Sequence, residues 1–142
     1  MMTMNTREFS TLLAQFSKGR NAVGCTASEI ETLERNLNTS LPDDYKLFLR
    51  TCGHGVDDFM KGSDFKYGEL ADLQEAAREL IDESNATAIP TGSVVFLMHQ
   101  GYQFYFLNET GVYYYMEGEA DYEKRHDSFG EFFRSVVAKV MA

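Results

Sequence analysis

The sequence contains little cysteine and no long apolar run. Its two cysteines, Cys25 and Cys52, are too few for a disulfide framework, and Cys52 lies on the apolar stripe of a predicted helix. We therefore expect both to be reduced thiols in the core. No run approaches the roughly 18 to 20 apolar residues of a membrane span, and residues 1–10 are polar and lack a signal-peptide stretch. These features predict a cytoplasmic protein without membrane contact.

Basic residues are also scarce. The chain of 142 residues holds 13 lysines and arginines against 22 aspartates and glutamates, which gives a net charge of -9. Residues 1–56 are balanced, with six acids and six bases, so the excess lies in residues 57–142. A negative field repels phosphates, whose neutralisation by Lys and Arg supplies much of nucleic-acid and anionic-membrane affinity. We expect no direct contact with nucleic acid.

Patterns typical of catalytic and metal sites are missing. His54, His99 and His126 have no ligand-like spacing with one another or with cysteine, and neither H-E-x-x-H nor C-x-x-C occurs. Cys52 with a histidine could form a nucleophile pair, but a buried apolar thiol is inert. The sequence predicts no cofactor, no metal and no catalytic residue. A polar pocket holding His54 or His99 beside carboxylates would instead indicate a small-ligand-binding or enzymatic domain.

Five segments show the spacing of amphipathic helices. They are residues 9–16, 28–37, 42–52, 69–83 and 128–140. Ser28 with Glu31, and Ser128 with Glu131, fit the capping-box pattern at a helix start. Gly53 is expected to end the third helix in a left-handed conformation.

Three short apolar runs follow Pro90 and predict an antiparallel β-meander. The runs are residues 94–98, 102–107 and 112–116, and their connections have hairpin lengths and contain glycine. Residues 64–67 are expected to add a short strand. The class is therefore α+β, with a central meander flanked by N-terminal helices, an acidic middle helix and a C-terminal helix. Residues 1–142 are predicted to form a single domain, because this length and 44% apolar content suffice for one core.

The block L-P-x-D-Y-x-x-F-L resembles the opening of the SUKH superfamily of Smi/Knr-like domains. Its motif positions here are Leu41, Pro42, Asp44, Tyr45, Phe48 and Leu49. The later order of elements is also similar, so the resemblance covers about residues 25–142. Members often continue with an N-G-G-like turn, whereas residues 51–55 read T-C-G-H-G. The resemblance implies a scaffold role for these six residues and supplies no catalytic residue.

That resemblance implies binding to another protein. Bacterial members include immunity proteins that neutralise polymorphic toxins, many of them nucleases, and fungal members coordinate signalling. Two interpretations follow: an immunity protein that inhibits a toxin, which a toxin gene directly upstream would favour, or a regulatory scaffold for endogenous proteins. Because a fold name alone does not establish function, the residues must support the choice.

One face of the predicted helix at residues 69–83 is acidic. It carries Asp72, Glu75, Glu79 and Asp82, which form like-charge pairs three or four residues apart. Each such pair destabilises its own helix by roughly 0.2–0.5 kcal/mol. A basic partner would relieve this repulsion, whereas the alternative is a solvated face that maintains solubility.

Tyrosines cluster beside a second acidic segment. Six of the eight lie between residues 102 and 122. An open face carrying Tyr105, Tyr113 and Tyr115 and bordered by acids would have the composition of a protein-binding surface. The bordering acids are Glu117, Glu119 and Asp121. The alternative is that most of these rings belong to the core.

Overall fold

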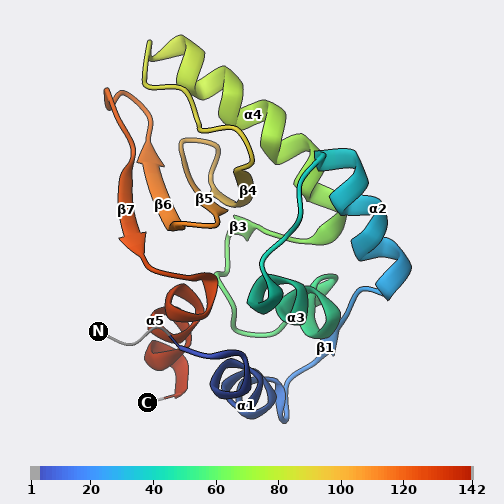
Figure 1. The fold of residues 1–142 in the computed structure, drawn as a ribbon. Helices are drawn as coiled ribbons and strands as arrows, with labels where there is room; N and C mark the ends of the chain where they lie inside the picture. Colours follow the sequence, from blue (N-terminus) through green and yellow to red (C-terminus); the bar gives the residue numbers. More distant parts are fainter. Residues whose placement is uncertain (1–3, 142) are drawn as a thin grey trace.

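The computed structural model describes residues 4–141, so the first three residues of the polar N-terminal segment lie outside it. The helices are α1 (Thr6–Ser17), α2 (Ala27–Leu37), α3 (Asp43–Cys52), α4 (Leu70–Glu83), α5 (Phe129–Met141) and a single 3-10 turn, η1 (Tyr67–Glu69) (Figure 1). The strands are β1 (Ala22–Val23), β2 (Gly55–Val56), β3 (Ser63–Asp64), β4 (Val94–His99), β5 (Gln103–Asn108), β6 (Gly111–Met116) and β7 (Glu123–His126).

An antiparallel sheet in the order β3-β4-β5-β6-β7 forms the centre of the fold. The predicted meander is confirmed as β4, β5 and β6. Two strands extend it: β3 pairs with the end of β4, and β7 pairs with β6. The α+β class is therefore confirmed, and β7 is the strand of this sheet that the sequence did not predict. A separate pair, β1 and β2, was not predicted either.

Aromatic residues join the helices to the sheet. Phe96 of β4 contacts Tyr45 of α3 at 5.9 Å between ring centroids, and Phe129 and Phe132 of α5 at 5.4 and 5.1 Å. Helix α1 packs against α3 and α5, while α4 runs beside β4 (Figure 1). All five predicted helices are present. Their buried apolar faces meet in one core, which also contains both free cysteines as predicted.

The predicted start of one helix is wrong. Helix α2 is capped by Thr26 and Glu29, not by Ser28 and Glu31: the Thr26 side chain accepts from the Glu29 amide, and the Glu29 side chain accepts from the Thr26 amide. The same pattern of residue types occurs twice in this segment, so spacing alone did not choose the right pair.

Gly53 follows α3, but it is not left-handed. Its φ and ψ are −60° and −24°, which any residue adopts. Glycine is required there for space, because a Cβ would lie 2.3 Å from the Sγ of Cys25 and 2.6 Å from the carbonyl oxygen of Leu49. The segment before α2 therefore passes close to the end of α3.

Candidate interaction surface

Helix α4 separates apolar and acidic side chains onto two sides. The inward side chains are all buried: Leu70, Leu73, Ala77, Leu80 and Ile81. On the outward side, Asp72, Glu75, Glu79 and Asp82 are exposed. The 3.6-residue period thus aims the four predicted carboxylates into solvent from a helix that the core holds in place.

A polar side chain on the sheet-facing side of α4 anchors the helix to β4. The amide of Gln74 donates to the carbonyl oxygen of Val95 at 2.7 Å, and its oxygen accepts from the Val95 N–H at 2.9 Å. Strand β3 pairs only with Met98 and His99, so it does not reach Val95. Gln74 takes the place of a neighbouring strand there and covers an otherwise open sheet edge.

The segment after α4 is tied to the loop between β6 and β7. The Ser84 hydroxyl accepts from the Gly118 N–H at 3.2 Å, and the Thr87 N–H donates to the Ala120 carbonyl at 3.0 Å. These bonds place the acidic end of α4 beside the acidic loop, which is the β6–β7 connection that carries Glu117, Glu119 and Asp121. Two acidic groups that are separate in the sequence are thereby adjacent in the fold.

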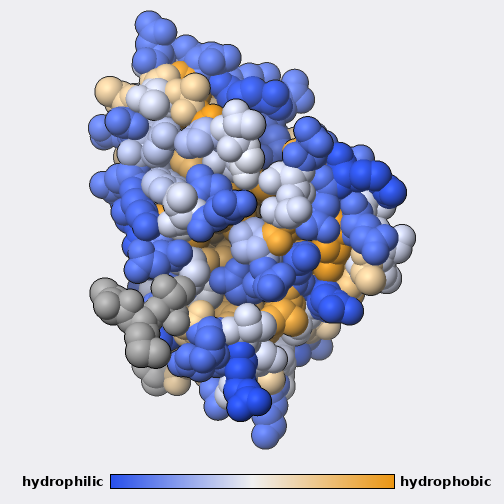
Figure 2. Space-filling model, in the orientation of Figure 1, coloured by the Kyte–Doolittle hydropathy of each residue, from blue (hydrophilic) through white to orange (hydrophobic). Residues whose placement is uncertain are grey.

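We define the acidic surface as the exposed carboxylates of α4 and of this loop. Its members are Asp72, Glu75, Glu79, Asp82, Glu83, Glu117, Glu119 and Asp121. Within residues 4–141, none of the eight takes part in an ion pair. Figure 2 shows hydrophilic residues along the upper edge of the molecule, where α4 lies in the orientation of Figure 1. The charge of this surface is therefore available to a partner.

Tyr115 is not part of any exposed surface, so its predicted contact with a partner is wrong. Its side chain is 1% exposed, and its ring packs on Phe104 with centroids 5.4 Å apart. The hydroxyl donates to the Glu119 carbonyl oxygen at 2.8 Å. Tyr115 instead holds the acidic loop to the sheet, because its ring fills the core while its polar end reaches the loop backbone.

The other two predicted tyrosines lie on opposite faces of the sheet. Tyr105 pairs with Tyr114 and Tyr113 pairs with Phe106 in the β5–β6 register. Tyr105 is half-buried against Phe132 of α5, at 5.0 Å, and burial raises the pKa of its hydroxyl. The three predicted tyrosines therefore do not form one exposed face, because Tyr105 and Tyr113 lie on opposite sides of the sheet and Tyr115 is buried.

Tyr113 borders a groove on its own face. Its ring stacks on Phe106 at 5.1 Å, and its hydroxyl lies 2.6 Å from the Thr110 Oγ1. Together with Tyr122 and Pro42 it lines a cavity of about 590 Å³. Neither His54 nor His99 is among the described residues that line this cavity, so it differs from the pocket that would indicate a small-ligand-binding or enzymatic domain. His54 lines a separate cavity together with Asp57.

The three histidines have three different surroundings. The Nδ1 of His99 lies 2.9 Å from the Ser63 Oγ, and His126 packs on Phe132, where burial lowers the pKa of its imidazole. His54 is exposed and lies beside Glu29 and Cys25. Among the residues that the structure describes, this last group combines ligand types that could hold a metal ion.

Four residues of the L-P-x-D-Y-x-x-F-L block, Leu41, Tyr45, Phe48 and Leu49, are buried in the core. Pro42 is the N-cap of α3, one position before the helix begins. These five positions fix α3 against the core, so they shape the fold and offer little surface to a partner.

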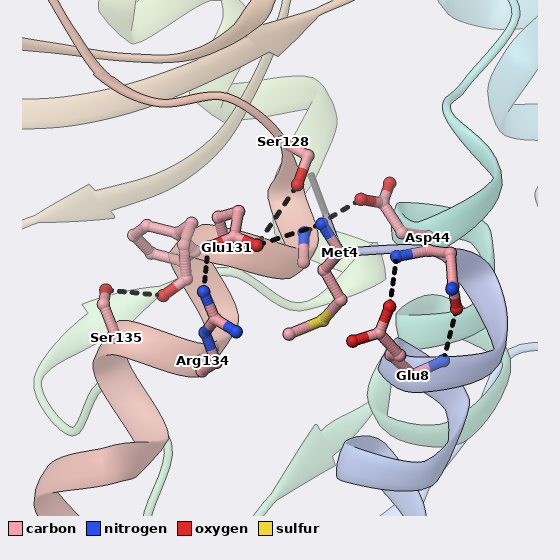
Figure 3. A network of polar contacts seen from close by, with 10 residues as sticks. Met4, Glu8, Asp44, Ser128, Glu131, Arg134 and Ser135 are labelled. Atoms are coloured by element: carbon pink, nitrogen blue, oxygen red, sulfur yellow. Dashed lines mark hydrogen bonds and ion pairs between the residues drawn. The ribbon is translucent and has the colours of Figure 1, made fainter. Parts of the chain in front are cut away.

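Asp44, the remaining position of the block, joins α3 to α5 (Figure 3). One carboxylate oxygen accepts from the Gly130 N–H at 2.8 Å and the other from the Tyr45 N–H at 2.8 Å. Desolvation by burial raises the pKa of this carboxyl. The motif aspartate is thus a bridge between two helix starts.

The predicted capping box at the start of α5 is half formed. The Ser128 hydroxyl accepts from the Glu131 N–H at 3.2 Å, as predicted. The Glu131 carboxylate, however, accepts from the Met4 N–H at 3.1 Å and from Arg134 (Figure 3). Glu131 therefore links α5 to the segment before α1, a long-range contact that local spacing did not reveal.

The fold and the buried block together define a Smi/Knr-type α+β domain. A profile of the SMI1 / KNR4 family (SUKH-1) matches residues 24–135. The chain belongs to that family. A comparison with curated proteins found no match. Among the helices described, none has the length and apolar character needed to cross a membrane.

Proposed function

We propose that this protein is a cytoplasmic, non-enzymatic binding module that neutralises a cognate polymorphic toxin by covering it with the acidic surface. Family membership supports a protein-binding role, since the SUKH resemblance implies immunity proteins. The observation that supports the choice of surface is the adjacency of the α4 acids and the β6–β7 loop. Binding blocks the toxin sterically and requires no bond to be made or broken.

The charge of this surface indicates the chemistry of the partner. Like charges three and four residues apart on α4 repel one another by roughly 0.2–0.5 kcal/mol per pair, and Arg78 is the one basic residue in the helix. A cationic surface, such as the substrate-binding face of a nuclease, removes this repulsion when it binds. The negative field also steers a cationic partner toward the surface and accelerates association.

Reversing charge on α4 tests the proposal. In Glu75→Lys with Glu79→Lys, both positions are exposed and form no ion pair within residues 4–141, so the fold should be retained. The partner captured by the wild-type protein from its native cells should associate at least tenfold more slowly with the variant at low salt. The rate should also depend less steeply on ionic strength.

A matched control changes the same charge elsewhere. Glu31 lies on α2 and Glu109 lies in the β5–β6 turn, and both are exposed. Both double variants change the net charge equally. Beyond that shared effect, Glu31→Lys with Glu109→Lys should leave the association rate within about twofold of wild type. Equal association rates for the two double variants would reject the acidic surface as the binding site.

A further inference from the structure

Two glycines allow the segment before α2 to lie against the end of α3. A Cβ on Gly24 would lie 1.7 Å from the Arg50 carbonyl oxygen, and one on Gly53 would lie 2.3 Å from the Cys25 Sγ. The Cys25 N–H donates to the Leu49 carbonyl at 2.8 Å. Close backbone approach therefore fixes the Cys25 thiol beside the turn that follows α3.

The same turn brings His54 to the start of α2. Pairing of β1 with β2 includes a bond from the His54 N–H to the Val23 carbonyl at 2.8 Å. The Nε2 of His54 lies 3.0 Å from Oε2 and 3.1 Å from Oε1 of Glu29. Because Oε1 also accepts from the Thr26 N–H at 2.8 Å, it keeps its role in capping α2. Oε2 is left facing the imidazole.

We propose that Cys25, Glu29 and His54 form a binding site for a thiophilic divalent cation of the zinc type. One ligand atom from each residue lies within 4.8 Å of the other two. Zinc bonds of about 2.0–2.3 Å to nitrogen, oxygen and sulfur place ligand atoms roughly 3.3–3.7 Å apart in a tetrahedron. The imidazole nitrogen and the nearer carboxylate oxygen, 3.0 Å apart, would separate slightly, and the thiol, within 4.8 Å of both, would approach by at most about 1 to 1.5 Å.

Electrostatics favours a cation at this position. Burial and, to a smaller extent, the nearby Glu29 carboxylate together raise the pKa of the Cys25 thiol to about 11. The same carboxylate attracts a metal ion, which replaces the thiol proton when it binds. Sulfur, imidazole and carboxylate ligands together select zinc or cobalt over magnesium and calcium, which prefer oxygen.

Cobalt titration of the untagged, reduced protein detects the site directly. Thiolate coordination produces a ligand-to-metal charge-transfer absorption in the near ultraviolet, and the structure predicts one cobalt per chain. Zinc should displace the cobalt, whereas magnesium should not. Absence of the absorption from the wild-type protein would overturn the proposal.

Variants assign the ligands. Cys25→Ser should abolish the charge-transfer absorption, and His54→Gln and Glu29→Gln should each weaken zinc binding at least tenfold. Glutamine suits the third position of a capping box, so Glu29→Gln removes the charge and preserves the cap of α2. His54 is exposed, so its variant tests the site even if Cys25→Ser does not fold.

Cys52→Ala and His99→Gln are the matched controls. Each removes a residue of the same type outside the cluster, and both should leave the absorption and the zinc affinity unchanged. If His54→Gln and Glu29→Gln bound zinc as tightly as wild type, or if Cys52→Ala removed the absorption, the assignment would be refuted. The site is independent of the acidic surface, so this result and the partner-binding result are separable.

Discussion

At the scale of single residues, Tyr45 carries a polar group at an apolar position. The side chain is 1% exposed, and its hydroxyl has no hydrogen-bond partner among the described residues. Since an unsatisfied buried hydroxyl costs about 1–3 kcal/mol, Tyr45→Phe should raise the free energy of unfolding by about 1 kcal/mol in urea titrations. A loss of more than about 1 kcal/mol would show that the hydroxyl is satisfied in solution.

Asp44 predicts a specific pH dependence. Burial raises the pKa of its carboxyl in the folded protein above the unfolded value. The folded state therefore binds a proton at higher pH than the unfolded state does. Protonation of Asp44 consequently adds to the free energy of unfolding as pH falls from the raised pKa toward the ordinary one. Asp44→Asn removes the titration.

The measurement for Asp44 compares urea unfolding of wild type and Asp44→Asn between pH 7 and pH 4. The variant keeps one acceptor for the N–H groups of Tyr45 and Gly130 and loses the other, so it should be less stable at every pH. The difference in free energy of unfolding between wild type and Asp44→Asn should widen as pH falls. If this difference narrowed as pH fell, the pKa of the Asp44 carboxyl in the folded protein would be lower than its burial implies.

Residue types alone predicted burial on α3 better than they predicted exposure on the sheet. The spacing of Tyr45, Phe48 and Leu49 on one helical stripe identified them as core, and all three are buried. The tyrosines of β5 and β6 gave no such signal, because both alternating sets of side chains are apolar or aromatic. Whether a ring such as Tyr115 is covered depends on helices that lie elsewhere in the chain.

At the scale of elements, α4 and β4 depend on Gln74. It supplies a donor and an acceptor to Val95, so Gln74→Leu leaves both backbone groups of that residue without their partner. We expect a loss of about 2 kcal/mol in the free energy of unfolding and faster amide exchange at Val95. Glu75→Leu, on the exposed side of the same helix, should change stability by less than about 0.5 kcal/mol. Similar losses in the two variants would contradict the edge-covering role.

Elements with strong periodicity were predictable, and those without it were not. Helix α4 and the strands of the meander follow helical or hairpin patterns over many residues. Strand β7 reads E-K-R-H and is largely exposed, so it has no apolar alternation and is defined only by pairing with β6. The cap of α2 was misplaced by two residues, since the same pattern of residue types fits Thr26 and Ser28 equally well.

At the scale of the whole molecule, both proposed sites combine segments that are distant in sequence. Spacing along the chain did not predict the grouping of Cys25, Glu29 and His54. These residues are brought together by the β1–β2 ladder and by the close backbone approach at Gly24 and Gly53. Likewise, the sequence indicated two acidic segments without showing that they adjoin. Local patterns predict elements, whereas such sites arise from the packing between elements.

If the acidic surface acts as one unit, its two segments should contribute to the same association step. Glu117→Lys with Glu119→Lys in the loop should slow association of the captured partner about tenfold at low salt, as should the charge reversal on α4. Combining all four changes should multiply the two effects, because electrostatic steering sums over charges. Stopped-flow or surface-binding kinetics at several salt concentrations measure this, with thermal melts to verify folding. If the α4 pair slowed association and the loop pair did not, the interface would be confined to α4 and would exclude the β6–β7 loop.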